Sequence, residues 1–208
     1  MNSSESKVQS ELILARKLNF NEQKLKLIKL FVREVLNFNK KYNLISKNSE
    51  IDIWKRHVLD SAQLVKYIDH KNFHSLADIG TGGGFPGIPL AIFFPEVNFY
   101  LIDGVGKKVE SVKEVIKKLD LKNVIAEKVR AEDFNEIVDF VTVRAVSKIK
   151  NFLPWIKKNF SPNNSRSIDR GLICLKGGNL SNEISRAFVT YTLCFFAKTF
   201  IICRTVLL

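Results

Sequence analysis

The first third of the chain shows the spacing of apolar residues that is typical of amphipathic helices. Across residues 22–39, apolar side chains recur every three or four positions with lysines between them, and Asn21 precedes them as a candidate N-cap. A second apolar stripe covers residues 51–65, and Ser49 followed by Asp52 resembles a capping box at its start. This pattern predicts two amphipathic helices before any strand.

After residue 70 the pattern changes to short, mostly apolar runs separated by segments of helical length. The runs have the length of buried strands. They occupy residues 76–79, 99–102, 124–126, 140–143 and 172–175. The segment 106–119 has the helical period that a connection between parallel strands requires. The chain is therefore predicted to be an α/β protein with a doubly wound, mostly parallel sheet.

The length and composition fit one structural domain. A chain of 208 residues, 46% of them hydrophobic, can bury a core without metals or disulfides, and we expect a helical segment (1–70) packed on the core of a domain (71–208). Three cysteines without CxxC spacing or a nearby histidine predict neither a disulfide framework nor a metal site. We interpret them as small core residues: Cys174, Cys194 and Cys203. A polar N-terminus and the lack of a long apolar run predict a cytoplasmic protein without a membrane partner. We also expect a monomer.

The chain carries an excess of positive charge. Its 33 Lys and Arg residues stand against 21 Asp and Glu residues, and the formal net charge of +12 favours a nucleic acid or an anionic surface as partner. A lysine-rich composition accounts for such an excess equally well, so the charge supports an RNA partner without deciding for it. The candidate RNA surface consists of Lys24, Lys26, Lys29, Lys40, Lys41, Lys107 and Lys108, with Phe38, Tyr42 and Trp54 available for stacking. The alternative interpretation places these lysines on solvated helix faces and the aromatic residues in the core.

The most informative segment is the glycine-rich turn after the first predicted strand. Residues 78–87 read Asp-Ile-Gly-Thr-Gly-Gly-Gly-Phe-Pro-Gly, with an acid two positions before the first glycine. Glycines let the backbone turn sharply and approach a ligand closely, and the helix that follows is expected to offer free amide N–H groups. This geometry predicts a site for a nucleotide-like cofactor, and a simple tight surface loop is the alternative.

Two cofactors compete for this turn. Gly82, Gly84 and Gly87 satisfy the dinucleotide pattern, and Asp103 ends the second strand where an acid that binds ribose is expected. Asp78 favours S-adenosylmethionine, because a carboxylate can interact with that cofactor's ammonium group directly or through water and would lie unfavourably beside a pyrophosphate. An NAD-dependent oxidoreductase is the weaker alternative, since the sequence also lacks an acid–base pair suited to hydride transfer.

Residues 78–89, which read DIGTGGGFPGIP, resemble the signature of the glucose-inhibited division protein B family. The resemblance continues between residues 37 and 178 through an ordered series of short motifs: KYNL (41–44), RHVLDS (56–61), DGVGKKV (103–109), RAEDF (130–134), Arg144–Ala145 and LKG (175–177). The family consists of methyltransferases that use S-adenosylmethionine to methylate guanine N7 in small-subunit (16S-type) ribosomal RNA. The resemblance implies this activity, a partner in ribosomal RNA or the small ribosomal subunit, and a Rossmann-like class I methyltransferase fold with a seven-stranded sheet.

The resemblance also implies roles for individual residues in cofactor binding. With the residues from the turn, the predicted cofactor site comprises Asp78, Gly80, Gly82, Gly84, Phe85, Asp103, Ala131, Glu132 and Arg144. Asp103 would hold the ribose hydroxyls. All of these residues lie at or just after the carboxyl ends of predicted strands, where ligands bind in a doubly wound sheet. Without the resemblance, Glu132 would be interpreted as part of a solvated acidic turn.

A motif before the sheet supplies candidate contacts to the substrate. Arg56, His57, Asp60 and Ser61 are adjacent or one helical turn apart, and we expect them to form a polar edge over the site. A single histidine is more often structural, but the resemblance favours His57 as a catalytic residue. Arg56 suits an RNA phosphate because its donors form a fixed fork, and the adjacent pair at 107–108 adds positive charge for the same substrate.

Methylation of guanine N7 needs no catalytic base, because this nitrogen has a free lone pair and carries no proton. Alignment of the two reactants can supply most of the rate, and a carboxylate or carbonyl group near the base would stabilise the cationic product. Arg144 and Lys176 are the remaining catalytic candidates. We expect them to orient the cofactor carboxylate, the base oxygen or an RNA phosphate.

The C-terminal part departs from the family pattern. Two closing antiparallel strands are expected after residue 185, but residues 191–208 show no recognisable match, and the stretch 161–170 is long. Apolar residues at 193–196 and 200–203 are suited to two strands. A lapsed methyltransferase that acts only as a basic RNA-binding protein is therefore a further alternative. Which guanine is methylated, and whether the substrate is naked RNA or an assembled subunit, stay open.

Overall fold

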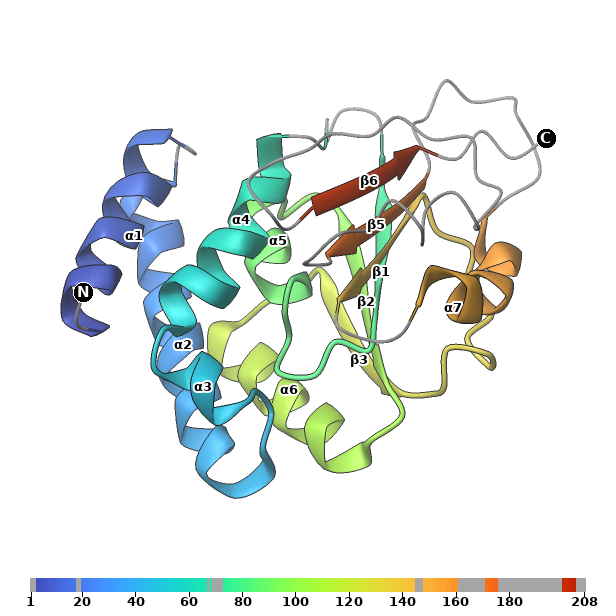
Figure 1. Ribbon diagram of the computed structural model, residues 1–208, viewed down its shortest axis with the longest axis horizontal. Helices are drawn as coiled ribbons and strands as arrows, with labels where there is room; N and C mark the ends of the chain where they lie inside the picture. The colour runs from blue at the N-terminus through green and yellow to red at the C-terminus, as the bar shows by residue number, and fades with distance from the viewer. Residues whose placement is uncertain are drawn as a thin grey trace.

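Figure 1 shows a twisted sheet with helices packed around it. The computed structural model describes residues 3–17, 20–66, 68, 73–144, 148–160, 171–175 and 200–204. Within these ranges no helix is both long enough and apolar enough to cross a membrane.

The sheet contains six strands within the described ranges, in the order β3-β2-β1-β4-β5-β6. The strands are β1 (Ser75–Ile79), β2 (Asn98–Asp103), β3 (Val124–Lys128), β4 (Phe140–Arg144), β5 (Gly171–Leu175) and β6 (Phe200–Arg204). Neighbours from β3 to β5 pair in parallel, and β6 pairs antiparallel with β5. The strand order reverses between β1 and β4, and this reversal creates a crevice at the carboxyl ends of the strands.

The five predicted runs are confirmed as strands, and the doubly wound parallel sheet is confirmed with them. Leu76 packs on one face of the sheet, whereas Ala77 and Ile79 pack on the other, so β1 is buried on both faces. Burial on both faces explains why these strands read as nearly continuous apolar runs. The expected count of seven strands is not confirmed by the described residues. The candidate strand at 193–196 and the stretch 161–170 lie outside them.

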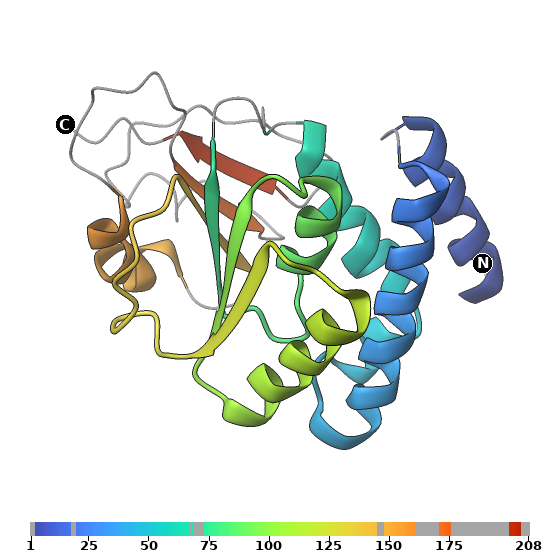
Figure 2. The ribbon, with the colours of Figure 1, turned by 180° about the vertical axis from the view of Figure 1, so that it is seen from behind.

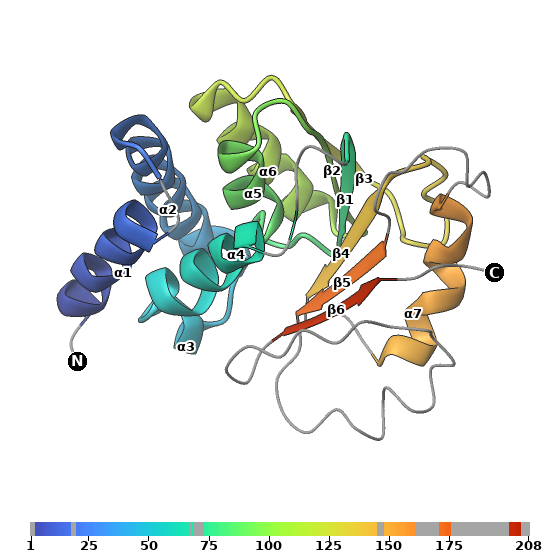
Figure 3. The same cartoon turned by 90° about the horizontal axis from the view of Figure 1, so that it is seen from above.

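Helices cover both faces of the sheet, as the view from above shows (Figure 3). One face is covered by α2 (Glu22–Tyr42), α5 (Gly87–Phe93) and α6 (Gly106–Leu119), and the other by α7 (Ile149–Ile156), which continues into the 3₁₀ turn η4 (Lys157–Asn159). From behind, α6 lies beside α2 (Figure 2). The predicted helix over residues 106–119 is confirmed with its bounds.

The longest helix, α2, begins where the sequence predicts. The side chain of Asn21 accepts a hydrogen bond from the Lys24 amide at 2.9 Å, which confirms the N-cap. At the other end Asn43 adopts a left-handed conformation with φ of 48° and stops the helix after Tyr42. The sequence pattern predicts that this helix ends at residue 39, about one turn before its observed end.

The second predicted helix is not a continuous α-helix. It is divided into α3 (Lys47–Glu50), the π-helix η1 (Trp54–Leu59), α4 (Asp60–Gln63) and the 3₁₀ turn η2 (Leu64–Lys66). The predicted capping box at Ser49 is wrong, because Ser49 lies inside α3 and its amide donates to the hydroxyl of Ser46 at 3.2 Å. Ile51 is 70% exposed and does not belong to the apolar stripe, whereas Trp54 and Val58 are buried.

The N-terminal helices share a hydrophobic core with the sheet. Leu14 from α1 (Ser3–Lys17) and Phe31 from α2 belong to the same cluster of buried side chains as Leu76 and Leu101. The division of the chain at residue 70 therefore stays a prediction, since this packing runs across it. Cys174 is buried, as expected of a core residue.

Gly87, the first residue of α5, allows a close approach between this helix and β2. A Cβ atom at this position would lie 2.2 Å from Leu101 Cδ2 and 3.0 Å from Asp78 Oδ2. We predict that Gly87→Ala lowers the free energy of unfolding by about 2–3 kcal/mol through overpacking, measured by denaturant titration. Gly104→Ala is the matched control, because its Cβ would meet Arg130 Cγ at 3.7 Å, an ordinary contact. Equal stability of the two variants would contradict the prediction.

Candidate active site

The glycine turn lies at the carboxyl end of β1, next to the point where the strand order reverses. Gly80, Gly82 and Gly84 have φ angles of 73°, 57° and 89°, which other residues rarely adopt. The turn is pinned to β2, since the Gly80 amide donates to the Ile102 carbonyl at 2.8 Å. The turn therefore has a defined conformation at the position where doubly wound sheets bind ligands.

Asp78 lies beneath this turn and is 1% exposed. Its Oδ2 accepts hydrogen bonds from the Thr81 hydroxyl at 2.7 Å and the Gly87 amide at 3.1 Å, and its Oδ1 accepts from the Thr142 hydroxyl at 2.9 Å. Burial raises the pKa of this carboxyl to about 6, although these three hydrogen bonds act in the opposite direction. In this geometry Asp78 holds the turn, and any effect on a ligand is exerted through the turn.

The amide groups at the start of α5 are used inside the protein. Gly87 donates to Asp78, Ile88 donates to the Gly84 carbonyl at 2.8 Å, and Leu90 donates to the Pro86 carbonyl at 3.2 Å. Pro89 has no amide hydrogen to donate. The expectation that this helix offers free amide N–H groups to a ligand is therefore wrong. The reason is local, since the buried acid and the two prolines take or remove those donors.

Asp103 ends β2 beside the turn. Its Oδ2 accepts from the Gly82 amide at 3.1 Å, and its Oδ1 accepts from the Val105 amide at 2.9 Å. The carboxylate thus joins the ends of β1 and β2 at the crevice, which is the position expected of a ribose-binding acid. Ala131 and Glu132 lie in the turn after β3, where Ala131 is half-buried and Glu132 is exposed. An exposed Glu132 fits both a ligand contact and a solvated turn.

The N-terminal helices cover one side of the glycine turn. The segment after α2 brings Leu44 and Ile45 against it, and both side chains are buried. A Cβ atom on Gly83 would lie 3.4 Å from Leu44 Cβ and 3.5 Å from Ile45 Cγ2. The side-chain oxygen of Asn39 accepts from the Ile45 amide at 2.9 Å and fixes this segment. The sequence motifs indicated the turn but not this cover.

His57 and Phe85 lie together at the edge of the site. Their ring centroids are 4.8 Å apart, and Phe85 also packs on Phe31 at 4.8 Å. Both ring nitrogens of His57 are buried and have no hydrogen-bond partner among the described residues. Burial, followed by the charges of Arg144 and Arg56, lowers the pKa of His57 to about 3. The imidazole is therefore neutral at physiological pH.

Arg144 ends β4 and reaches the helical segment that carries His57. One of its Nη atoms, Nη2, donates to the main-chain carbonyl of Arg56 and lies 4.0 Å from Asp60 Oδ2. The other, Nη1, is buried and has no hydrogen-bond partner within the described ranges. The structure thus places Arg144, which was not part of the predicted polar edge, beside the segment that carries His57 and Asp60. Lys176 lies outside the described residues.

The candidate RNA surface separates into buried and exposed members. The Lys24 amine donates to the Phe93 carbonyl at 2.9 Å, and burial lowers the pKa of this lysine. Lys29 pairs with Glu11 at 2.8 Å, and Trp54 is only 7% exposed, so the expected stacking of Trp54 on RNA is wrong. Lys107, at the start of α6, is exposed, and its neighbour in sequence Lys108 is half-buried. Arg56, the separately predicted phosphate contact, is also exposed.

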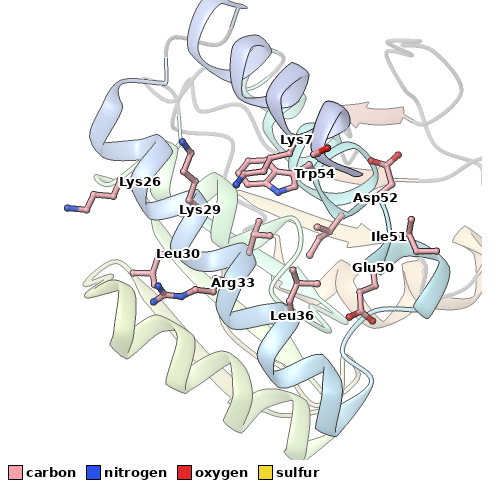
Figure 4. Close-up of a pocket in the computed structure, with 13 residues that line it drawn as sticks. Lys7, Lys26, Lys29, Leu30, Arg33, Leu36, Glu50, Ile51, Asp52 and Trp54 are labelled. Carbon is pink, nitrogen blue, oxygen red and sulfur yellow. The ribbon is translucent and has the colours of Figure 1, made fainter. Parts of the chain in front are cut away.

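A groove of about 1110 Å³ opens on the outer side of α2 (Figure 4). Lys26, Lys29 and Arg33 line one part of it, and Glu50 and Asp52 line another. No residue of the glycine turn contributes to its lining. The groove is therefore separate from the candidate active site.

Comparison with known proteins points to one family. The family model described as rRNA small subunit methyltransferase G matches residues 24–205. The protein named Ribosomal RNA small subunit methyltransferase G from Bacteroides thetaiotaomicron is 41% identical over 173 residues, 83% of this chain and 84% of that protein. A relative with the same name from Flavobacterium johnsoniae is 43% identical over 148 residues, 71% of each chain.

Solved structures share the fold at low identity. A SAM dependent methyltransferase from Aquifex aeolicus has a TM-score of 0.55 and 19% identity, with coverage of 69% of this chain and 89% of that chain. The N,N-8-amino-8-demethyl-D-riboflavin dimethyltransferase from Streptomyces davawensis has a TM-score of 0.58 and 16% identity, with coverage of 77% and 57%. Both support the methyltransferase type of doubly wound sheet.

The family match includes the segment 179–205, which the series of short motifs did not reach. Part of that segment is β6, which closes the sheet against β5 in the antiparallel sense. With the strand order, the glycine turn and the identities above, this match leaves one assignment. The chain belongs to the GidB family, the family of rRNA small subunit methyltransferase G.

Proposed function

We propose that this chain transfers the methyl group of S-adenosylmethionine to N7 of a guanine in small-subunit ribosomal RNA. The family match and the relatives' name support the reaction on small-subunit RNA, and the family's chemistry supports guanine N7. The crevice at the ends of β1, β2 and β4 is the proposed cofactor site. We further propose a cytoplasmic monomer that acts on ribosomal RNA or on the small subunit.

The cofactor assignment rests on one observation: the main-chain amides at the start of α5 already donate hydrogen bonds within the protein. A dinucleotide needs free amides there to bind its pyrophosphate, and a nearby negative charge opposes that group. Here Gly87 donates to the buried acid Asp78, and Ile88 and Leu90 donate to main-chain carbonyls. A positively charged sulfonium cofactor needs no such donors. This geometry favours S-adenosylmethionine over NAD.

The residues of the polar edge fit a reaction without a catalytic base. Guanine becomes cationic as the methyl group is transferred, and a positive imidazole beside it would oppose that charge. His57 stays neutral because burial and two neighbouring arginines lower its pKa to about 3. We assign His57 and Phe85 to the wall of the base site and Arg144 to the orientation of the reactants. Gly80, Gly82 and Gly84 would accommodate the cofactor, and Asp103 would bind its ribose.

The tail bears on whether the enzyme is active. The alternative of a lapsed enzyme rested on a tail without a recognisable match to the family. Instead β6 (Phe200–Arg204) pairs with β5 over five residues, and the family match continues to residue 205. These observations favour an active methyltransferase over a protein that only binds RNA.

We predict that the purified chain binds S-adenosylmethionine in the micromolar range and does not bind NADH, measured by calorimetry. Gly82→Arg should abolish binding, because its side chain would start from the turn that encloses the cofactor. Circular dichroism would verify that the variant is folded. Binding of NADH instead would overturn the cofactor assignment, and binding of neither by a folded protein would support a lapsed enzyme.

We predict that the chain forms 7-methylguanosine in small-subunit ribosomal RNA. The measurement is transfer of a labelled methyl group, followed by mass spectrometry of the nucleosides. Parallel reactions with naked RNA and with small subunits from cells that lack the enzyme would identify the substrate form. Methylation at another atom or in another RNA would refute the proposed reaction.

We predict that Lys107 and Lys108, the two lysines at the start of α6, contact RNA phosphates. The double variant Lys107→Ala/Lys108→Ala should raise KM for RNA and reduce the slope of log KM against log salt by about 1–2, because each phosphate contact contributes roughly 0.7–0.9. Lys113→Ala/Lys117→Ala removes two exposed lysines further along the same helix and should leave KM unchanged. Equal effects of the two double variants would exclude a local contact.

A further inference from the structure

Asp60 contacts the candidate site through Arg144. It is the first residue of α4, and its Oδ2 lies 4.0 Å from Arg144 Nη2. Both side chains are largely buried, with 26% of Asp60 and 19% of Arg144 exposed. The pair joins the helical segment before the sheet to the carboxyl end of β4. Nothing in the cofactor motifs indicates this carboxylate, because it precedes the sheet in the sequence.

The guanidinium of Arg144 is held on one side only. Nη2 contacts the Arg56 carbonyl and the Asp60 carboxylate, while Nη1 has no partner among the described residues and is shielded from solvent. A buried donor without a partner costs free energy unless a ligand satisfies it. An arrangement of one fixed nitrogen and one unsatisfied nitrogen is suited to presenting the second to an acceptor.

A carboxylate is required to keep this arrangement in place. Burial disfavours the charged form of Arg144, and its pKa is lowered for that reason, whereas Asp60 and Asp78 favour the charge. Both oxygens of Asp78 already accept hydrogen bonds from the turn, α5 and β4. Neutral His57 contributes no negative charge. Asp60 is therefore the carboxylate available to orient the guanidinium.

We propose that Asp60 is a positioning residue for methyl transfer, which fixes the Arg144 guanidinium so that Nη1 meets an oxygen acceptor on the bound reactants. The acceptor is either the carboxylate of the cofactor or O6 of the guanine, both of which are oxygens that a guanidinium binds well. The proposal rests on the proposed function for the reaction, but the geometry of the pair is independent of it. Asp60 acts through Arg144 and does not itself contact the reacting atoms.

The ionisation of Asp60 makes this role dependent on pH. Burial raises the pKa of its carboxyl to about 6. The positive charges of Arg144 on β4 and of Arg56 and Lys55 on η1 lower this pKa, and the negative charge of Asp52 raises it. Above pH 6 Asp60 is negative and holds the guanidinium. As the pH falls through about 6 the carboxyl gains a proton, the attraction is lost, and the rate should fall.

The test uses the full chain with Asp60→Asn, Asp60→Glu and, as matched control, Asp52→Asn. The control makes the same chemical change eight residues earlier, at the groove of Figure 4. Because Asp52 raises the pKa of Asp60, the rates are compared well above pH 6, where Asp60 is charged with or without Asp52. We expect Asp60→Asn to lower methyl transfer by roughly 10- to 100-fold, as misplacement of a positioning group does. Asp60→Glu should recover part of the rate, and Asp52→Asn should match the unmodified chain.

Two cofactor analogues distinguish the acceptors. S-adenosylhomocysteine carries the cofactor carboxylate, whereas methylthioadenosine lacks it. If Nη1 binds the carboxylate, Asp60→Asn should weaken the binding of S-adenosylhomocysteine by at least about 10-fold, which corresponds to the loss of about one charged hydrogen bond. The affinity for methylthioadenosine should stay unchanged. If Nη1 binds guanine, both affinities stay the same and the loss is in the RNA reaction alone.

The pH profile separates positioning from a general loss of structure. The rate of the unmodified chain should fall as the pH drops through about 6, and the Asp60→Asn profile should fall less steeply. Asp78, whose pKa is also about 6, is present in both proteins and contributes equally. Unchanged rate and analogue affinity in Asp60→Asn would overturn the proposal, as would equal losses in Asp60→Asn and Asp60→Glu with a lowered melting temperature.

Failure of the proposed function would look different. An unmodified chain that forms no 7-methylguanosine would refute the reaction while the analogue titrations still test Asp60. In that case, an Asp60→Asn variant with unchanged affinity for S-adenosylhomocysteine would overturn this inference as well.

Discussion

The geometry of the glycine turn depends on the hydrogen bonds that the carboxylate of Asp78 accepts. This carboxylate accepts hydrogen bonds from the turn through Thr81, from α5 through Gly87 and from β4 through Thr142, so one side chain joins four elements. Hydrogen bonds to a charged acceptor contribute about 1.5–3 kcal/mol each, which offsets part of the cost of burying the carboxylate. The close approach of α5 to β2 and the left-handed turn both rely on this arrangement.

The same carboxylate determines which chemistry the crevice can support. By accepting from Gly87 it places negative charge where a pyrophosphate would bind, and the prolines on either side of Gly87 remove two further donors. The turn therefore resembles a dinucleotide site in its glycine spacing but differs from it in its donors. On the other side of the crevice, Arg144 supplies positive charge and a donor, Nη1, that has no partner in the part of the chain that the structure describes. The crevice thus separates a region that tolerates a cationic ligand from one that suits an acceptor.

The sequence predicted the sheet well because strands buried on both faces produce continuous apolar runs, and each of the five runs became a strand. It also predicted α6 and the N-cap Asn21, because both are encoded by residues that are close together in the sequence. The segment 47–66 was not predictable in this way. Its apolar stripe has a helical period, but that period does not specify the π-helical turn at Trp54–Leu59 or the 3₁₀ turn at Leu64–Lys66.

The candidate site was predictable only in part. The acid, the glycines and Asp103 follow strands and could be recognised from their spacing. The saturation of the α5 amides could not, because it depends on the rotamer of a buried side chain that the spacing does not specify. The pairing of Asp60 with Arg144 joins residues 84 positions apart and arises only when the helical segment packs on β4. The burial of Trp54 likewise follows from tertiary packing.

The cover that Leu44 and Ile45 form over Gly83 has a consequence for how the protein responds to ligands. These residues follow α2 directly, and Asn39 of α2 holds them in place. A ligand that stabilises this conformation of the glycine turn would therefore also stabilise the packed arrangement of α2. By reciprocity, displacement of α2 would lower the affinity for that ligand. If the cofactor binds at the proposed site, the N-terminal helices would thus be thermodynamically coupled to its occupancy, although they supply none of the residues of the glycine turn.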